Sequence, residues 1–455
     1  MVPQKIVLIN PWQAHLVTRH GKIYNRIWPP LSLANCAALL EQQGHHVQVI
    51  DANALRLSPE EVAQTSSGCA KAFICSADID RWQCPPLDLE PFFTTVSHVK
   101  RSVEEVYVIG PHGTVRPEAI LRHTRAHAVV MGEPEWTITE ICNGAPLEAV
   151  KGLAYFHSGK IKFNESSRPV DLNALPAPAF HLLPMGRYHY EVLGSRFTLL
   201  EASRGCASQC RFCMMRMYGH GVRRKKTDRL VSEVELAISR YGVKTAYFMD
   251  LEFTVLRNQV LELCEHLIRR RLDFRWTCQT RFDLIDSHLL RQMKLAGCSL
   301  IHFGVEAGSD SLLKKVNKGI TIDQIRAGMR LVKEAQMDSA CFFMLGFPES
   351  NEHEIADTIR FARQLNPTYA LFHLVTPYPG TALYEDLERS HPEIVRSTLF
   401  PEACCQGEDL VRLKTFIRRA YLGFYLRPSY IRSRLARGNL RSLIGQTKLM
   451  FGYLR

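Results

Sequence analysis

Two successive series of short apolar runs separated by helix-like segments constrain the fold of this chain more than any other feature. In the first series the runs are rich in Val and Ile, and strands are expected at residues 5–10, 46–51, 71–76, 106–110 and 128–132. Strands that alternate with helices are typical of a parallel sheet covered by helices on both faces. The sequence therefore predicts an α/β fold that begins with a doubly wound parallel sheet, whose ligands bind beyond the carboxyl ends of its strands.

A second series begins near residue 197 and has a longer period. Its six strands are expected at residues 197–202, 245–250, 275–281, 300–306, 340–346 and 369–377. Amphipathic segments separate them, and the one at 321–335 begins with Thr321 and Gln324 in the spacing of a capping box. Six βα units are too few to close an eight-stranded barrel, so we expect a partial six-stranded βα (TIM-like) barrel. The active sites of such barrels lie at the carboxyl ends of the strands.

This pattern divides the chain into four parts. Residues 1–150 are expected to form the doubly wound domain, and residues 191–390 the barrel domain. Residues 151–190 contain four prolines between positions 169 and 184 and one expected β-hairpin at 153–163, and they are interpreted as a linker. Residues 391–455 are expected to form a basic, helical C-terminal region.

Three closely spaced cysteines follow the first barrel strand. Cys206, Cys210 and Cys213 form CASQCRFC, a C-x3-C-x2-C motif. Three thiolates can hold three irons of a [4Fe–4S] cluster, and the fourth iron is then open to chelate S-adenosylmethionine. Electron transfer into the sulfonium of that cofactor breaks a carbon–sulfur bond and gives a 5′-deoxyadenosyl radical. A structural zinc site with His220 as the fourth ligand stays open as an alternative, although closed zinc sites favour paired C-x2-C elements.

Several further segments carry a family resemblance. They are FMDLEFTV, WTCQTRFD, MKLAGCSLIHFGVEAGSD, KKVNKGIT, FFMLGFPES and TPYPGTALY. Together with CASQCRFC they resemble the branch of the radical S-adenosylmethionine superfamily that has an N-terminal cobalamin-binding domain, over roughly residues 5–390. The resemblance implies a cobalamin-binding-like domain, a radical S-adenosylmethionine domain, and three cofactors: a [4Fe–4S] cluster, S-adenosylmethionine and cobalamin. It also implies an enzyme, a methyltransferase that acts on an unactivated carbon of an unidentified substrate.

The resemblance further suggests roles for single residues. It implies that Cys206, Cys210 and Cys213 hold the cluster. The residues expected to contact S-adenosylmethionine or shape its pocket are Phe212, Asp250, Glu252, Arg281, Glu306 and Ser309. An alternative for two of them is a buried ion pair between Glu306 and Arg281. One departure from the family lies in the loop GFPESN, where a glycine and a glutamate often follow the proline.

The first domain resembles family cobalamin domains in the segments WPPLSLANCAALLEQQGHHVQVIDAN, VIGPHGTVRPEAIL and VVMGEPE. The residues expected to contact cobalamin are Ser76, Gly110, His112, Gly113 and Thr114. The two glycines would let the backbone approach the ligand, and the other three would hydrogen-bond its nucleotide tail. The cobalamin signature D-x-H-x-x-G is absent, so His112 is interpreted as a polar loop residue and not as a cobalt ligand. A domain that has kept only the fold, without cobalamin, is the alternative.

Other functions stay open at this point. A radical enzyme of the same branch could rearrange or oxidatively cyclise its substrate without net methylation. Cys69, Cys75 and Cys84 could hold a second cluster, as in methylthiotransferases that act on transfer RNA, but the first two lie at the edges of an expected buried strand. The non-enzymatic alternative is a zinc-stabilised binding module.

Positive charge is concentrated at the C-terminus. The formal net charge is +12, yet residues 411–455 contain eleven Lys and Arg and no Asp or Glu. Residues 410–426 have apolar side chains at helical spacing beside basic ones. This tail is expected to close the open barrel, to lie on anionic lipid, or to bind RNA. Its FYLRP segment resembles tails of related enzymes that act on hydrophobic substrates, which favours membrane contact over nucleic acid.

The sequence also indicates where the protein is located and what it binds. The N-terminus shows no secretory leader, and no stretch reaches the roughly 18 uninterrupted apolar residues that span a bilayer. Fourteen cysteines in such a chain indicate the reducing cytosol. We therefore expect a cytoplasmic protein with peripheral membrane contact through its tail. The expected partners are a small-molecule or lipid-like substrate and an electron donor such as flavodoxin or ferredoxin.

Overall fold

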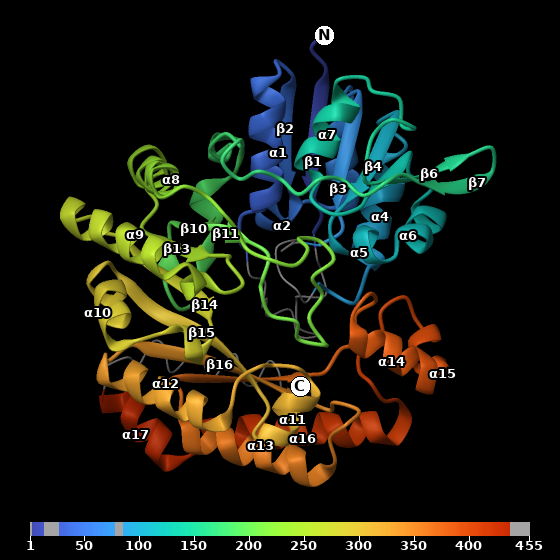
Figure 1. The fold of residues 1–455 in the computed structure, drawn as a ribbon. Helices are drawn as coiled ribbons and strands as arrows, with labels where there is room; N and C mark the ends of the chain where they lie inside the picture. Colours follow the sequence, from blue (N-terminus) through green and yellow to red (C-terminus); the bar gives the residue numbers. More distant parts are fainter. Residues whose placement is uncertain (1, 13–26, 78–84, 437–455) are drawn as a thin grey trace.

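Two β-sheets form the two halves of the molecule, one built by the first part of the chain and the other by its middle (Figure 1). The computed structural model describes residues 2–12, 27–77 and 85–436. Both sheets are parallel in their main part and carry helices, which confirms the predicted α/β fold.

The first sheet has seven strands in the order β2-β1-β3-β4-β5-β6-β7. Its five parallel strands are β1 (Lys5–Asn10), β2 (His46–Asp51), β3 (Lys71–Cys75), β4 (Glu105–Ile109) and β5 (Ala128–Val130). The winding reverses between β1 and β3, and doubly wound sheets bind ligands at such a switch point. The hairpin expected in the linker, β6 (Leu153–His157) and β7 (Lys160–Phe163), pairs antiparallel with β5 and so extends this sheet.

Helices cover both faces of the first sheet. They are α1 (Leu31–Gln42), α2 (Ala52–Leu55), α3 (Pro59–Ser66), α4 (Glu90–Val99), α5 (Pro111–Val115), α6 (Pro117–Thr124) and α7 (Pro134–Cys142). Ile6 and Leu8 of β1 pack in one apolar core with α1 and α7, whereas Val7 and Ile9 pack in another with α3, α4 and α6. Because both faces are covered, β1 is a continuous apolar run and not an alternating one.

The second sheet has six parallel strands in the order β10-β13-β14-β15-β16-β17. They are β10 (Phe197–Leu200), β13 (Thr245–Phe248), β14 (Arg275–Thr280), β15 (Cys298–Glu306), β16 (Asp338–Leu345) and β17 (Tyr369–Leu374). The helices that connect them are α8 (Thr227–Tyr241), α9 (Arg257–Arg270), α10 (Ser287–Leu295), α11 (Asp310–Lys315), α12 (Ile322–Glu334) and α13 (Glu352–Leu365). This arrangement confirms the partial barrel.

Two short ladders and four helices complete the described chain. The ladders are β8 (His189–Tyr190) with β9 (Gly194–Ser195) and β11 (Ser203–Arg204) with β12 (Arg223–Arg224). The helices are α14 (Ala382–Ser390), α15 (Pro392–Arg396), α16 (Gly407–Tyr425) and α17 (Pro428–Ala436). The predicted capping box of α12 is confirmed, because the Thr321 side chain accepts from the amide of Gln324 and the Gln324 side chain accepts from that of Thr321.

The helix α16 covers the β17 edge of the second sheet. The hydroxyl of Tyr425 accepts from the amide of Ala370 at 3.1 Å and donates to its carbonyl at 2.9 Å. Tyr421 makes the same two contacts with Phe372 on the same strand. An edge strand has unpaired N–H and C=O groups, and here tyrosine hydroxyls take the place of a neighbouring strand. The described part of the tail therefore closes the barrel edge, and residues 437–455 lie outside the described residues.

We expect Tyr421→Phe/Tyr425→Phe to lower the free energy of unfolding by at least about 2 kcal/mol, because each unsatisfied buried polar group costs about 1–3 kcal/mol. Urea unfolding followed by circular dichroism measures the change. Tyr241→Phe, at a half-buried position on α8, is the control. If the double variant unfolds at the wild-type urea concentration, the hydroxyls do not stabilise the edge.

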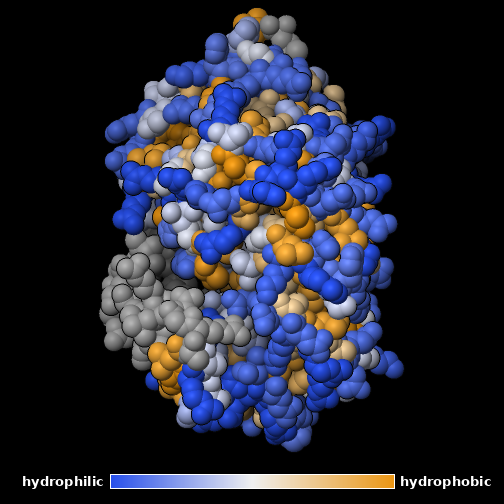
Figure 2. Space-filling model, turned by 90° about the vertical axis from the view of Figure 1, so that its left-hand side faces the viewer, coloured by the Kyte–Doolittle hydropathy of each residue, from blue (hydrophilic) through white to orange (hydrophobic). Residues whose placement is uncertain are grey.

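On the face drawn in Figure 2, hydrophilic residues predominate and apolar ones lie between them in small groups. Within the described ranges, no helix combines the length and the apolar character needed to cross a bilayer.

Candidate functional site

The cysteine loop, residues 206–213, follows β10 and β11 at the carboxyl edge of the second sheet. Its entrance is fixed by the backbone: the carbonyl of Cys206 accepts from the amide of Gly221 at 3.0 Å, and Cys206 forms a β-bridge with His220. Gly205 has a φ of +87°, and a Cβ at that position would collide with the carbonyl oxygen of Gly221. Only glycine allows the two backbones to approach this closely.

The exit of the cysteine loop is tied to two other segments. The amide of Arg211 donates to the carbonyl of Val316 at 3.1 Å, and its carbonyl accepts from the amide of Leu383 at 3.0 Å. The side chain of Asn317 donates to the carbonyl of Gln209 at 2.8 Å. Elements that are far apart in the sequence, just after α11 and at the start of α14, therefore hold the loop in place.

The three thiols of the loop differ in their surroundings. Cys206 is buried, whereas Cys210 and Cys213 are partly exposed. Burial, together with the nearby carboxylate of Glu252, raises the pKa of Cys206 to about 11. Burial also raises the pKa of Cys210, against the opposing effect of Lys318. Ligation of a metal or cluster here must therefore displace thiol protons.

The chemistry of the donor set fits an iron–sulfur cluster, because thiolates are the usual ligands of such clusters. Each of three loop cysteines can bind a different iron. Among the residues that the structure describes, no three His, Cys, Asp or Glu side chains are grouped so that they could hold one metal ion. The contact between Cys206 and His220, the proposed zinc partner, is a backbone bridge.

A polar network surrounds the first half of the cysteine loop. The hydroxyl of Ser208 donates to Glu252 at 2.6 Å and accepts from Arg281 at 3.1 Å, while the amide of Ser208 donates to the sulfur of Cys206 at 3.3 Å. Arg281 also pairs with Asp283 at 2.9 Å and donates to the carbonyl of Lys318 at 2.7 Å. The network brings Glu252 and Arg281, two of the predicted residues, together beside the loop.

Glu306 forms a buried ion pair, but not with the partner that the sequence suggested. Its carboxylate lies 2.9 Å from the ammonium of Lys318, and both side chains are about nine-tenths buried. The pair packs directly against Gly304, where a Cβ would collide with the Glu306 carboxylate and would displace it. The alternative of a Glu306–Arg281 pair is therefore wrong, since Glu306 pairs with Lys318 while Arg281 pairs with Asp283 and lies 3.8 Å from Glu252.

Glu306 also has an unusual backbone. Its φ is +66°, a left-handed conformation that is costly for a residue with a side chain and that is found preferentially at functional sites. Lys318 lies in the segment KKVNKGIT, which the sequence singled out without giving this lysine a role. Although burial alone would lower it, the carboxylate of Glu306 and the thiol of Cys210 raise the pKa of Lys318.

Three other predicted residues make structural contacts. Asp250 accepts from the hydroxyl of Ser203 at 2.5 Å and so points to the start of the cysteine segment, and burial raises its pKa to about 6. Ser309 caps the N-terminus of α11. The ring of Phe212 lies 5.7 Å from that of Phe347, in the loop after β16. Their contacts with S-adenosylmethionine stay predictions.

In the first domain, His112 is fully enclosed. Its Nε2 lies 2.7 Å from the carbonyl of Pro86, so that nitrogen carries the proton, and Nδ1 lies 3.1 Å from the hydroxyl of Ser76. Burial lowers its pKa to about 4, which keeps the ring neutral. Both ring nitrogens are engaged within the protein, but His112 lies in the short helix α5 and not in a loop as predicted.

The glycines near His112 are explained by packing. A Cβ on Gly110, whose φ is +100°, would lie 2.9 Å from the hydroxyl of Ser76. A Cβ on Gly113 would lie 2.6 Å from a methyl group of Val129. The hydroxyl of Thr114 donates to the carbonyl of Gly110 at 2.9 Å. Gly110 is the N-cap residue of the short helix α5, which contains Gly113 and Thr114, and the contacts of these residues with cobalamin stay predictions.

The switch point of the first sheet offers an unsatisfied polar atom. The side chain of Asn10, at the end of β1, donates to Asp51 at 3.0 Å, but its buried oxygen has no hydrogen-bond partner in the described ranges. An unpaired buried acceptor is costly, and a ligand with amide or hydroxyl donors would satisfy it. Cobalamin has such donors, so this edge fits it.

The structure describes two of the three cysteines considered for a second cluster. Cys69 is buried two residues before β3, and Cys75 is the last residue of that buried strand. Cys84 lies outside the described residues.

The chain is similar in sequence to a known family and to several known proteins. The family model described as the Radical SAM superfamily matches residues 200–362. An uncharacterized methyltransferase of Pyrococcus horikoshii is 30% identical over 446 residues, which cover 95% of this chain and 94% of the relative. The anaerobic magnesium-protoporphyrin IX monomethyl ester cyclase of Rubrivivax gelatinosus is 26% identical and covers 87% of this chain and 74% of its own.

One solved structure shares the fold of both halves. It is the radical S-adenosylmethionine methyltransferase TsrM of Kitasatospora setae, with cobalamin and a [4Fe–4S] cluster bound. The TM-score is 0.68 at 16% sequence identity, and the alignment covers 86% of this chain and 75% of the other. The likeness therefore includes the doubly wound sheet as well as the partial barrel.

Proposed function

This chain belongs to the radical S-adenosylmethionine superfamily, and we propose that it is a cobalamin-dependent methyltransferase acting on an unactivated carbon of a small-molecule or lipid-like substrate. The observation that carries this proposal is the cysteine loop, which presents three thiols at the carboxyl edge of a partial barrel. A relative named as a methyltransferase aligns along nearly the whole chain, which supports methyl transfer as the reaction.

We assign the [4Fe–4S] cluster to Cys206, Cys210 and Cys213. The amide of Ser208, which donates to the sulfur of Cys206, would stabilise the thiolate in the bound state. When bound, the cluster supplies the electron that cleaves S-adenosylmethionine, and cobalamin carries the methyl group. The chain's own residues bind and orient these groups.

The binding site for S-adenosylmethionine is proposed around Cys210. Glu306, Lys318 and Arg281 all act electrostatically on this thiol. Opposite charges on adjacent side chains suit the ammonium and carboxylate groups that S-adenosylmethionine presents to a cluster. Phe212, Asp250, Glu252 and Ser309 are proposed to complete the pocket walls.

Cobalamin is proposed to bind at the switch point of the first sheet. Asn10, at the end of β1, offers the buried oxygen without a described partner, and Ser76 lies at the end of β3. The adjoining helix α5 follows β4, begins after Gly110 and contains His112, Gly113 and Thr114. Because His112 has both nitrogens engaged within the protein, we propose that this histidine positions α5 and is not itself a cobalt ligand.

Anaerobic purification followed by metal analysis tests the proposal. We expect about four irons and four labile sulfides per chain, and one cobalamin after reconstitution. One equivalent of zinc without sulfide would instead support the zinc-stabilised binding module. With the true substrate, methylation releases S-adenosylhomocysteine as well as 5′-deoxyadenosine.

Oxidative cyclisation is the second candidate function, because a relative named as a cyclase aligns with 87% of this chain. Cyclisation needs the radical but transfers no methyl group. Formation of 5′-deoxyadenosine without S-adenosylhomocysteine, in the presence of the true substrate, would favour this candidate.

We further propose a cytoplasmic location, with a low-potential donor such as flavodoxin or ferredoxin, and peripheral membrane contact through the tail. The exposed residues Arg418 and Arg419 of α16 carry the positive charge of its outer side. Anionic lipids attract basic residues near their surface. Because α16 also covers the barrel edge, point substitutions test this contact better than deletion of the helix.

Arg418→Glu/Arg419→Glu is expected to lower co-sedimentation with phosphatidylglycerol vesicles at least tenfold, since each basic residue contributes about 1 kcal/mol near such a surface. The control is Arg240→Glu/Arg269→Glu, which changes the net charge equally on exposed positions of α8 and α9. Equal loss in both variants would indicate a net-charge effect, and no loss in either would remove the membrane contact.

A further inference from the structure

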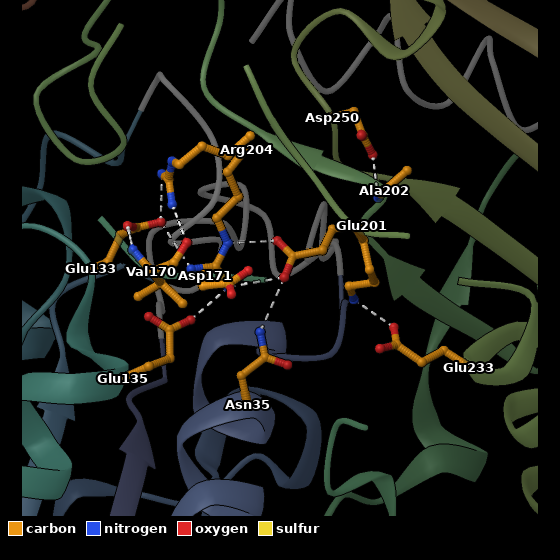
Figure 3. Close-up of polar contacts among 12 residues, drawn as sticks. Asn35, Glu133, Glu135, Val170, Asp171, Glu201, Ala202, Arg204, Glu233 and Asp250 are labelled. Atoms are coloured by element: carbon orange, nitrogen blue, oxygen red, sulfur yellow. Dashed lines mark hydrogen bonds and ion pairs between the residues drawn. The ribbon is translucent and has the colours of Figure 1, made fainter. Parts of the chain in front are cut away.

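Arg204 is a buried cation that lies two residues before the first cysteine of the loop. Its guanidinium makes four hydrogen bonds to three carboxylates (Figure 3). Glu201 accepts twice at 2.9 Å, Glu133 accepts at 2.9 Å, and Glu135 accepts at 2.6 Å. All four side chains are at least 96% buried.

The three carboxylates come from both halves of the molecule. Glu201 follows β10 of the second sheet, but Glu133 and Glu135 lie at the start of α7, directly after β5 of the first sheet. Glu201 also accepts from Asn35 of α1 at 3.3 Å. Arg204 therefore joins the cysteine-bearing segment to α7, and its partner Glu201 joins the same segment to α1 (Figure 3).

A second arginine reinforces the same connection. Arg223 of β12 donates to Glu133 at 2.9 Å and to the carbonyl of Val170 at 2.6 Å. Glu133 also accepts from the amide of Val170 at 2.8 Å. Since β12 pairs with β11, both strands of this short ladder are tied to the first domain through Glu133.

Stability alone does not explain this arrangement. Burying three carboxylates and a guanidinium removes them from water, and apolar residues of similar volume often serve stability as well or better. A planar guanidinium, in contrast, fixes the directions of several carboxylates at once. The cluster therefore specifies the placement of one half of the molecule relative to the other.

The placement is transmitted to the cysteine loop by a short, stiff segment. Arg204 and Ser203 are held in β11, and Asp250 fixes Ser203 from the neighbouring strand end. Gly205 then passes against Gly221 so closely that no Cβ fits. Hence a shift of the Arg204 side chain would move Cys206 as well.

We propose that Arg204, through Glu133 and Glu135, is a positioning residue that sets the distance and orientation of the cysteine loop relative to the first domain. The inference rests on the proposed function, in which the first domain holds cobalamin and the loop holds the cluster. Transfer of a methyl group from the sulfonium of S-adenosylmethionine to reduced cobalamin leaves S-adenosylhomocysteine and needs both halves in register. Reductive cleavage to methionine and the 5′-deoxyadenosyl radical, which becomes 5′-deoxyadenosine on taking a hydrogen atom, needs only the second half, which carries the loop and the proposed S-adenosylmethionine site.

The test compares these two products in the reconstituted full-length enzyme under a chemical reductant. Arg204→Lys keeps the charge and loses the planar fork, and Glu135→Gln keeps the shape and loses the charge. Both variants are expected to form S-adenosylhomocysteine at least tenfold more slowly, with 5′-deoxyadenosine formation within twofold of wild type. Misplacement by about 1 Å can slow a reaction between two bound groups about 100-fold.

Glu233→Gln is the matched control. Glu233 is as buried as Glu135 and lies 2.6 Å from the buried ammonium of Lys225, but both members of that pair belong to the second half. The control is expected to keep the wild-type ratio of the two products. A wild-type ratio in Arg204→Lys and Glu135→Gln, or an equal change in Glu233→Gln, would overturn the proposal.

Hydrogen–deuterium exchange gives a second measurement on the same full-length proteins. Amide exchange of residues 205–213 and 132–137 should rise at least threefold in Arg204→Lys and Glu135→Gln, and not in Glu233→Gln. If the wild-type enzyme forms no S-adenosylhomocysteine, the methyltransferase proposal fails, and the exchange measurement alone decides the positioning role. Unchanged exchange in both variants would then contradict it.

Discussion

Cys210→Ala is expected to abolish the [4Fe–4S] cluster and with it all formation of 5′-deoxyadenosine. The variant leaves Cys206 and Cys213 as the loop thiols, and two thiolates cannot fix a cluster that needs three protein ligands and one open iron. Iron and labile sulfide per chain after anaerobic reconstitution measure the first loss. The rate of 5′-deoxyadenosine formation under reductant, which should fall to the background without enzyme, measures the second.

A cysteine outside the loop provides the control. Cys405, between α15 and α16, is also partly exposed, and its thiol has a pKa raised by burial like that of Cys210. Cys405→Ala should retain iron, sulfide and activity at the wild-type level. Full iron and sulfide in Cys210→Ala would show that other ligands hold the cluster, and the assignment to the loop would be wrong.

The sequence predicted the strands well, because burial in a parallel sheet produces a local signal. All eleven strands expected in the two series are present, and their starts differ from the expected positions by at most two residues. Runs of Val and Ile identify a strand that is covered on both faces wherever it lies in the fold. The hairpin at 153–163 was also expected, but its pairing with β5 depends on contacts that no local pattern encodes.

The candidate site could be predicted in part. The spacing of the cysteines and the family resemblance indicated the loop, and Glu252 and Arg281 do lie beside it. The partner of Glu306 could not be predicted, since Lys318 lies twelve residues further along the chain, beyond α11, and no local pattern pairs the two. Arg204 was missed for a related reason: its three carboxylates come from two domains, and a buried charge leaves no periodic signal.

The structure of the C-terminal tail could also be predicted from the sequence only in part. Its apolar face was predicted from helical spacing, and Leu413, Ala420 and Phe424 are buried as that spacing requires. The role of Tyr421 and Tyr425 was not predicted, because a hydroxyl that pairs with the backbone of an edge strand looks in the sequence like any other aromatic residue. The basic composition of the tail suggested binding to lipid or RNA. The structure shows that one part of the tail, α16, packs on the edge strand of the barrel.

Substitutions in the Glu306–Lys318 pair are expected to change the stability and the activity of the protein in different ways. Glu306→Gln and Lys318→Met each leave one buried charge without its partner, which costs about 3–5 kcal/mol of unfolding free energy. The double variant Glu306→Gln/Lys318→Met removes both charges and keeps the volumes, so its stability should return to within about 1–2 kcal/mol of wild type. Urea unfolding of the metal-free proteins measures these differences.

Activity should not return in the double variant. If the pair binds the charged groups of S-adenosylmethionine, 5′-deoxyadenosine formation should stay at least about 100-fold below wild type, because two charge-assisted hydrogen bonds of about 1.5–3 kcal/mol each are lost. A double variant that regains both stability and activity would mean that the pair only holds the loop in place. The left-handed backbone of Glu306 argues against that outcome, since a residue needed for packing alone would gain stability from an ordinary conformation.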